Sequence, residues 1–425
     1  MMMDGEAAAH LFESLNEESF LFAAHKEIYR AGLKLFESGN LINIVSMSEG
    51  LEMMSKDRIK ERTDYLLNLD AMTPSSALIY SLVPRLKDKE ICRKIINITN
   101  ELTREAYNPS MTASDMLEIA ENKIFGLSQK VTERSFQDMK SLIPTVLDLM
   151  ERQFTNKGEL IGLATGISRL DILLSGLQKQ QLIVLAGDTR AGKSAFALNI
   201  AFRNAAKIKK VAYFSFEMSA IELAYRMICS YAELDSYSVR CGKIERNDFE
   251  NITRAASVLS EYGIYICDSS SMEINQIRSK ARKLMAREKI ELIVFDYLQQ
   301  IAPSGKFGSR AEAIALISRS LKSMAKEFDV PILALSQLRR TQYDKPRLHD
   351  LKESSGIEQD ADVVLFVYRP SLADDTEIKE DPEDAQIIIG KQRSGPADMT
   401  INVKFHKGRT EWNDVERYQK AAELF

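Results

Sequence analysis

The segment "LIVLAGDTRAGKSAFALNIAF", residues 182–202, decides the fold of this chain. It opens with an apolar run typical of a buried strand, passes through a glycine-containing turn, and continues with the periodicity of a helix. The turn matches the pattern G-x-x-x-x-G-K-[ST], with Gly187, Gly192, Lys193 and Ser194 at its fixed positions. Because a strand precedes the pattern and a helix follows it, we interpret the turn as a phosphate-binding loop and not as a chance glycine-rich turn.

In such a loop, backbone N–H groups at the start of the helix wrap the phosphates of a nucleotide. The side chain of Lys193 is expected to neutralise these phosphates, and the hydroxyl of Ser194 is expected to bind Mg²⁺. The segment therefore predicts a nucleotide with Mg²⁺ as the cofactors. The predicted nucleotide-binding residues are Gly187, Asp188, Thr189, Arg190, Ala191, Gly192, Lys193 and Ser194.

The residue pattern around this segment divides the chain into three parts. Residues 1–130 carry helical periodicity throughout, which predicts a smaller all-α domain. In residues 159–425, short apolar or β-branched runs alternate with helical segments, which predicts an α/β domain whose mostly parallel, twisted sheet is covered on both faces. Residues 131–158 are the linker between these two domains.

The linker contains one amphipathic helix, "LIPTVLDLMERQF", with apolar residues at spacings of three and four. Such a helix either docks on a separate body or packs on its own domain, and the pattern by itself leaves both readings open. The residues of the apolar face are Ile143, Val146, Leu147, Met150 and Phe154.

Composition narrows the class of protein without naming a function. The 425 residues hold no apolar run of about 20 and no secretory signal, so we expect a cytoplasmic protein that does not cross a membrane. The four cysteines contain no C-x-x-C pair, which argues against a disulfide framework and a zinc site. The net charge of −4 does not indicate nucleic-acid binding, although a few cations focused in a channel would escape such a count.

Three polar side chains lie at the predicted ends of strands, where open α/β sheets bind ligands. Glu217 either polarises an attacking water or favours the N-terminus of the following helix. Asp296 ends a run of apolar residues, the form of a Walker B strand whose aspartate holds the Mg²⁺ shell. Gln337 either senses a γ-phosphate or is a surface amide.

A fourth strand end carries two cations. In "AQIIIGKQRSGP", residues 385–396, Lys391 and Arg393 stand two positions apart and so point to the same face of a strand. This arrangement indicates that both side chains reach for one anion.

These stretches together resemble the DnaB-type replicative DNA helicases, which are ring-forming ATPases with a RecA-like motor domain. The motifs "FSFEM", "ISRSLK", "ALSQL", "SGIEQDAD" and "GKQRSGP" occur in the family's order, and the resemblance covers residues 138–415. It extends more loosely into the helical block at "TPSSALIYSLVPRLKDKEICRKII".

The resemblance implies a role for each of the polar residues above. Glu217 corresponds to the catalytic glutamate, Asp296 to the Walker B aspartate, and Gln337 to the glutamine that reads the γ-phosphate of ATP. Lys391 and Arg393 match the pair that reaches into the ATP site of the neighbouring subunit. The linker helix matches the segment that docks on an adjacent motor domain.

The resemblance also implies partners. It describes a homo-oligomeric, hexameric ring that encircles single-stranded DNA, moves 5′ to 3′, and cooperates with a primase and a helicase loader. Two loops that follow motor strands are expected to contact DNA phosphates without choosing a sequence. The predicted DNA-contacting residues are Lys306, Arg310, Lys352, Glu353, Ser355 and Gly356.

Two other functions are compatible with part of the sequence. One is a RecA-like recombinase that exchanges strands on open filaments. The other is a helicase-like accessory protein that binds partners at a replication origin and unwinds nothing. Two departures from the family favour the second alternative: the opening P-x-S-x-E-A-E pattern is missing, and Gly356 stands one place later than the family's glycine.

Overall fold

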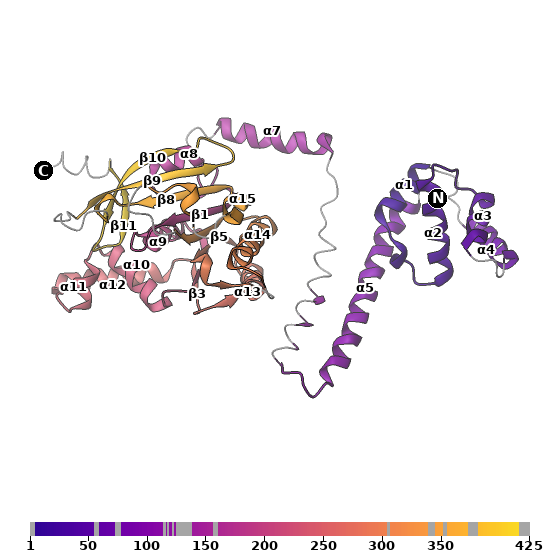
Figure 1. Cartoon of the computed structure of the whole chain (residues 1–425), viewed down its shortest axis with the longest axis horizontal. Coiled ribbons are helices and arrows are strands. Elements are labelled where there is room, and N and C mark those ends of the chain that lie inside the picture. Colours follow the sequence, from indigo (N-terminus) through magenta and orange to yellow (C-terminus); the bar gives the residue numbers. More distant parts are fainter. Residues whose placement is uncertain are drawn as a thin grey trace. The chain divides into compact units, whose positions relative to one another are not determined.

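The protein is described by a computed structural model in which two compact units, residues 1–146 and 147–425, are distinguished (Figure 1). The helix α7 crosses the boundary between them. The described residues are 5–54, 59–72, 78–113, 116, 119–120, 123–124, 138–155, 160–303, 307–338, 345–351, 355–372 and 381–415.

The first unit is helical, as predicted. Its two longest helices are α2 and α5, and Gly39, which directly follows the C-cap residue Ser38 of α2, has the positive φ of 67° expected of a glycine at a helix end. Phe12, Tyr29 and Val83 meet in its core. The helices of this unit are α1 (Gly5–Ser14), α2 (Ala23–Glu37), α3 (Ile44–Met54), α4 (Ile59–Ala71) and α5 (Leu78–Ala106).

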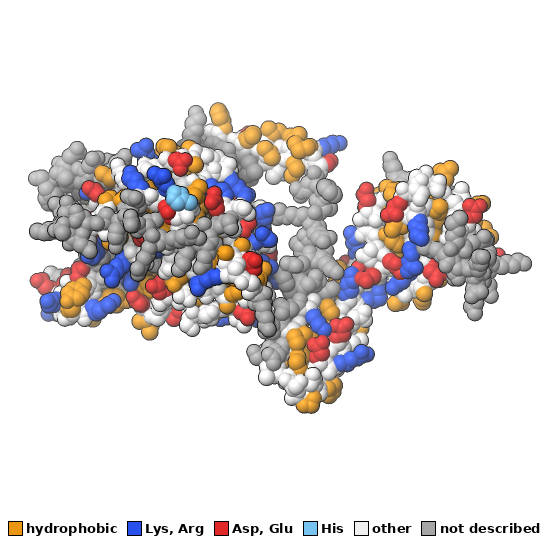
Figure 2. Space-filling view, viewed as in Figure 1, with side chains coloured by type: hydrophobic (Ala, Val, Ile, Leu, Met, Phe, Trp, Pro, Cys, Tyr) orange, Lys and Arg blue, Asp and Glu red, His pale blue; other side chains and the backbone are white. Residues whose placement is uncertain are grey.

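The linker helix is α7 (Met139–Thr155), and its apolar face is exposed to solvent. Figure 2 shows this face as a row of hydrophobic side chains along the helix. Their exposed fractions run from 45% at Val146 to 74% at Phe154. The face contains Met139, Ile143, Val146, Leu147, Met150 and Phe154.

The second unit is built on a sheet in which nine strands of the described residues follow the order β11-β10-β9-β8-β1-β7-β5-β2-β3. The part from β8 to β3 is parallel, and the part from β8 to β11 is antiparallel. The parallel strands are β1 (Leu182–Gly187), β2 (Lys210–Ser215), β3 (Ile264–Asp268), β5 (Ile290–Asp296), β7 (Ile332–Gln337) and β8 (Val363–Tyr368). The antiparallel strands are β9 (Glu383–Gln392), β10 (Met399–His406) and β11 (Glu411–Asp414).

Helices cover both faces of this sheet, which is why the central strands are apolar at every position. In β1, Ile183 and Leu185 join the core beneath α9, whereas Leu182, Val184 and Ala186 join the core beneath α14. The helices of the first face are α8 (Ser168–Leu174), α9 (Lys193–Ala205) and α10 (Ala220–Tyr231), and those of the second are α13 (Ile274–Arg287), α14 (Arg310–Phe328) and α15 (Ser355–Asp360). Two helices, α11 (Ser236–Arg240) and α12 (Arg246–Ser260), and a small pair of strands, β4 (Met272–Glu273) and β6 (Ile301–Ala302), complete the unit.

The structure differs from the sequence prediction at the C-terminal strands. The sequence pattern does not indicate β10 and β11, and within a sheet that it predicts to be mostly parallel, β9 runs antiparallel to β8. An apolar run such as that of β9 has the same pattern in either direction, so periodicity does not reveal its orientation. Because of this orientation, Lys391 pairs with Val364 near the start of β8.

Within the described part of the chain, no helix is both long and apolar enough to cross a membrane.

Candidate active site

The predicted phosphate-binding loop joins the end of β1 to the first residue of α9. Its backbone has positive φ at Arg190 (66°) and Gly192 (93°), which is the left-handed region that glycine enters at least cost. A Cβ atom at Gly187 would lie 2.6 Å from Cγ2 of Val367 in β8. Gly187 therefore allows the close approach of β8, and Gly192 allows the turn into α9.

Lys193 folds back over its own loop. Its Nζ donates hydrogen bonds to the carbonyl oxygens of Gly187 and Asp188, both at 2.9 Å. Burial lowers the pKa of Lys193 to about 8, although nearby carboxylates, led by that of Asp296, act in the opposite direction. The ammonium group is thus held against the backbone of the loop, where it could bind a phosphate group.

The ends of four parallel strands bring distant residues to one edge of the sheet. Gly187 of β1 lies level with Gln337 of β7, and Ser215 of β2 lies level with Asp296 of β5. The structure therefore places Gln337 and Asp296 at the same edge as the loop, as the motif order predicted.

Asp296 is almost completely buried, with 1% of its surface exposed. Tyr213 Oη donates a hydrogen bond of 3.0 Å to its Oδ2, whereas Oδ1 is buried and makes no hydrogen bond within the described part of the chain. Burial raises the pKa of this carboxyl group, and the nearby hydroxyls of Ser194 and Tyr213 act in the opposite direction. A buried carboxylate oxygen without a partner, beside the Ser194 hydroxyl, fits the oxygen ligands that Mg²⁺ prefers.

Glu217 is exposed and lies two residues beyond the end of β2. The N–H group of Phe216 donates to the carbonyl of Asp296 at 2.8 Å, which fastens this segment to the end of β5. The charge of Glu217 raises the pKa of both Lys193 and Asp296, so the carboxylate lies near these two residues. The cap of the next helix is supplied by Ser219, whose hydroxyl accepts from the N–H of Glu222.

Gln337 is connected to the segment that follows β5. Its N–H donates to Gln299 Oε1 at 3.3 Å, and Gln299 Nε2 donates to Ser336 Oγ at 2.9 Å. Gln299 belongs to the short 3₁₀ helix η2 (Leu298–Gln300). The amide of Gln299 therefore ties the end of β7 to the turn directly after the Asp296 strand.

Lys391 and Arg393 do not join this cluster, because the antiparallel β9 carries them to the opposite edge of the sheet. Lys391 Nζ donates to the carbonyls of Glu358 and Ala361, the latter at 2.8 Å. Arg393 donates to the carbonyl of Gln359 at 3.0 Å and forms an ion pair of 3.3 Å with Asp362, and half of its side chain stays exposed. Burial and the neighbouring guanidinium lower the pKa of Lys391.

Two of the predicted DNA-contacting residues are described in full. Arg310 is exposed and opens α14, whose N-cap is Ser309. Gly356 lies in α15, where an added Cβ would come within 2.4 Å of the Ala315 Cβ in α14. Ser355 begins α15, but its side chain is not described, and Lys306, Lys352 and Glu353 lie outside the described residues.

Sequence reasoning missed three residues that contact the site. Tyr213 bonds to Asp296, while Arg369 and Trp412 bond to the backbone of the loop. The one available signal was that Trp412 is the only tryptophan in the chain. The strand β11, which carries it, could not be recognised from four residues.

The geometry defines a class of protein. A phosphate-binding loop after β1, a buried aspartate at the end of β5 and a carboxylate after β2 converge at the edge where parallel sheets bind ligands. This is the arrangement of a P-loop nucleotide hydrolase.

Comparison with known proteins identifies the family. A family model described as the DnaB-like helicase C terminal domain matches residues 162–414, and the DnaB-like helicase N terminal domain matches residues 1–88. The replicative DNA helicase DnaB of Geobacillus stearothermophilus is 34% identical, over 100% of this chain and 94% of its own length. The replicative DNA helicase DnaC of Bacillus subtilis (strain 168) is 35% identical, over 95% and 90% respectively.

A solved structure of similar fold agrees with these relatives. A structure described as that of a DnaB-like replicative helicase and its interactions with primase superposes with a TM-score of 0.75 at 25% identity, over 97% of this chain and 99% of that one. The chain belongs to the DnaB-like helicase family. It is a replicative DNA helicase and therefore a nucleotide hydrolase. The comparisons favour neither the recombinase nor the accessory protein that unwinds nothing.

Proposed function

We propose that this helicase works as a ring of six copies that encircles single-stranded DNA, translocates 5′ to 3′ with ATP and Mg²⁺, and displaces the complementary strand. One observation carries the proposal. The two parts of the hydrolytic site that the sequence predicts lie at opposite edges of one sheet, so a single chain does not assemble them.

The separation follows from strand register. Arg393 lies level with Asp362, which precedes β8, and Asp362 lies level with Leu182 at the start of β1. The phosphate-binding loop begins at Gly187, five residues further along β1 and therefore about 16 Å away along the strand direction. Arg393 of one copy can reach a nucleotide on a second copy if the two motor units pack edge to edge. Such packing, repeated with rotation, closes a ring.

Each residue at the carboxyl edge has a proposed role. The backbone of residues 187–194 and the ammonium of Lys193 hold the phosphates, Glu217 accepts a proton from the attacking water, and Gln337 senses the γ-phosphate. Ser194 and Asp296 would hold Mg²⁺, which neutralises charge on the transferred phosphoryl group. The buried Oδ1 of Asp296, which makes no hydrogen bond among the described residues, supports this assignment.

The linker helix supports assembly. In the proposed organisation, residues 1–130 form a helical domain, residues 131–158 a linker, and residues 159–425 the motor. The exposed apolar face of α7 favours docking on an adjacent motor over packing on its own domain, because such a row of side chains is costly to leave in water.

The proposed DNA contacts among the described residues are Arg310 and the segment that contains Ser355 and Gly356. The other proposed contacts, Lys306, Lys352 and Glu353, lie outside the described residues. Primase and a helicase loader are the proposed protein partners, and the cytoplasm is the proposed location. The structural relative described with primase supports the first of these partners.

Complementation between two inactive variants tests the shared site. We expect Arg393→Ala to retain nucleotide binding and to lose turnover by about 10³-fold or more, as for other arginines that act in trans. Glu217→Gln should also be inactive. Mixed assemblies of the two variants should regain DNA-stimulated hydrolysis, because some interfaces combine an intact Glu217 with an intact Arg393.

The matched control is Arg409→Ala, which removes an arginine that pairs with Glu233 on a different surface. It should hydrolyse ATP at the normal rate. Normal turnover by Arg393→Ala alone, or mixtures that stay inactive although the variants co-assemble, would refute the proposal that the site is shared between copies.

A further inference from the structure

Two side chains outside the predicted site bond to the backbone of the phosphate-binding loop. Arg369, directly after β8, donates from Nη1 to the carbonyl of Arg190 at 2.7 Å. Trp412 of β11 donates from Nε1 to the carbonyl of Gly192 at 3.2 Å. Both donors come from the C-terminal half of the sheet and are buried, Arg369 at 5% and Trp412 at 0% exposure. They are therefore held in place before any ligand arrives.

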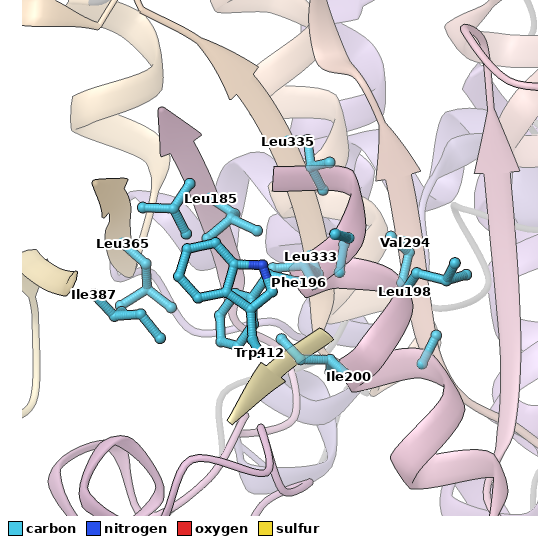
Figure 3. Close-up of a cluster of buried hydrophobic side chains, with 14 of the residues drawn as sticks. Leu185, Phe196, Leu198, Ile200, Val294, Leu333, Leu335, Leu365, Ile387 and Trp412 are labelled. Carbon is cyan, nitrogen blue, oxygen red and sulfur yellow. The ribbon is translucent and has the colours of Figure 1, made fainter. Parts of the chain in front are cut away.

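An aromatic side chain joins the two donors. The guanidinium of Arg369 lies 4.6 Å from the ring centroid of Phe405, and that ring lies 4.8 Å from the ring of Trp412. Figure 3 shows Trp412 beside Phe196 of α9, whose ring is 5.7 Å away. A Cβ added at Gly192 would lie 3.0 Å from the indole, so the loop packs directly on these side chains. We call this group the support of the loop; it contains Arg369, Phe405, Trp412 and Phe196.

The charge of Arg369 is balanced within the same support. Its Nη2 pairs with Glu383, the first residue of β9, which also accepts from the hydroxyl of Ser371. Burial lowers the pKa of Arg369, and the carboxylate opposes that shift. The guanidinium therefore stays charged and makes a charge-assisted hydrogen bond to the loop.

The two carbonyls that are held belong to the residues with positive φ, Arg190 and Gly192. In a planar trans peptide unit the C=O and N–H groups point in opposite directions. Holding the carbonyls of residues 190 and 192 therefore aims the N–H groups of Ala191 and Lys193 away from the support and toward the inside of the loop. The Ala191 N–H donates to Asp188 there, and Lys193, as the first residue of α9, has no acceptor within the helix.

We infer that Arg369 and Trp412 are positioning residues for the nucleotide, which fix the backbone of the loop and with it the orientation of the Lys193 N–H group toward a phosphate. This inference rests on the proposed role of residues 187–194 as the ATP site. It assigns to the C-terminal part of the sheet, from β8 to β11, a task in phosphate binding within the same chain.

Steady-state kinetics of the full-length, assembled protein test the inference. Trp412→Phe keeps a ring against Phe405 and removes only the N–H donor, so KM for ATP should rise about five- to tenfold while kcat changes less than about twofold. Arg369→Lys keeps the charge but cannot serve both Arg190 and Glu383, so KM should rise about tenfold or more.

The control for a purely structural effect is Phe202→Leu. Phe202 lies on α9 and packs on Tyr231 and Tyr262, neither of which belongs to the support of the loop. This variant should lower the unfolding temperature without raising KM. The inference is overturned if both positioning variants have the wild-type KM, or if KM rises equally in Phe202→Leu at a matched loss of stability.

The single tryptophan supplies a second readout. Emission from Trp412 should change on titration with ATP, and Arg369→Lys should shift the midpoint by the same factor as KM. Lys193→Ala separates the two proposals. If Lys193→Ala still binds ATP normally, the proposed ATP site is wrong. If it abolishes binding while Arg369→Lys binds like wild type and Trp412→Phe has the wild-type KM, only the positioning role is wrong.

Discussion

The parallel and antiparallel parts of the sheet distribute functional residues in different ways. The parallel strands β1, β2, β5 and β7 deliver Gly187, Glu217, Asp296 and Gln337 to one edge, although these residues are spread over 150 positions of sequence. The antiparallel strand β9 has Glu383 at one end, near the support of the loop, and Lys391 at the other.

This difference has a physical origin. Before each parallel strand, the chain crosses back to the side of the sheet where the strands start. All parallel strands therefore end at the same edge. An antiparallel strand runs back, so its last residues reach the edge where the parallel strands begin. A sheet with both parts therefore presents anion-seeking groups at two edges. In the proposed ring, the carboxyl edge would bind a nucleotide, and the other edge would meet the nucleotide of a second copy.

The largest expected effect lies at the carboxyl edge. Glu217→Gln should reduce ATP turnover by about 10²- to 10⁴-fold, since the amide cannot accept the proton, while nucleotide affinity and unfolding temperature stay near wild type. Single-turnover hydrolysis and equilibrium binding measure the two properties separately. Glu222→Gln, on the exposed side of α10 and paired with Arg226, is the matched control and should remain active. Wild-type turnover in Glu217→Gln would show that Glu217 does not accept the proton of the attacking water.

At the opposite edge, the buried carboxylate of Asp362 and its partner Lys322 are expected to contribute to stability. Lys322 of α14 donates to the buried carboxylate of Asp362 at 2.6 Å, and that carboxylate also accepts from the N–H of Leu182. Lys322→Met should lower the free energy of unfolding by about 2–3 kcal/mol, less than for a fully isolated buried charge because Arg393 remains as a partner.

Denaturant unfolding followed by Trp412 fluorescence measures this change. Lys326→Met, the same substitution one turn later at an exposed position of α14, should have little effect. The contrast between the two edges would break down if Lys322→Met kept full stability and lost turnover.

The smallest expected effect concerns the packing of α15, the helix whose backbone carbonyls accept hydrogen bonds from Lys391 and Arg393. Gly356→Ala places a Cβ 2.4 Å from the Cβ and 2.6 Å from the Cα of Ala315, so the two helices must separate. We expect a loss of about 1–2 kcal/mol in the free energy of unfolding.

Gly308→Ala is the control for Gly356→Ala, because among the described residues its new Cβ would meet only the flexible carboxylate of Glu312, at 3.4 Å. Equal stability of the two variants would show that α15 tolerates displacement. In that case the contacts of Lys391 and Arg393 with α15 would not depend on close helix packing.

Much of the motor unit could be read from local pattern. The glycines, lysine and serine of residues 187–194 have fixed spacing because backbone geometry and phosphate size demand it, and β1, β2, β5 and β7 are recognisable as apolar runs that end in polar residues. The edge shared by Gln337 and Asp296 follows from parallel strand direction.

The sequence by itself thus determined the α/β class and the order of the motor motifs, and it predicted the phosphate-binding loop, because each depends on neighbours within a few residues. Only the tertiary structure decided that β9 runs antiparallel, that Lys391 and Arg393 lie at the opposite edge, and that Arg369 and Trp412 support the loop. The direction of a strand depends on the connection that leads into it, and contacts between residues 179 to 220 positions apart depend on which surfaces are buried together. The local periodicity of the sequence encodes neither property.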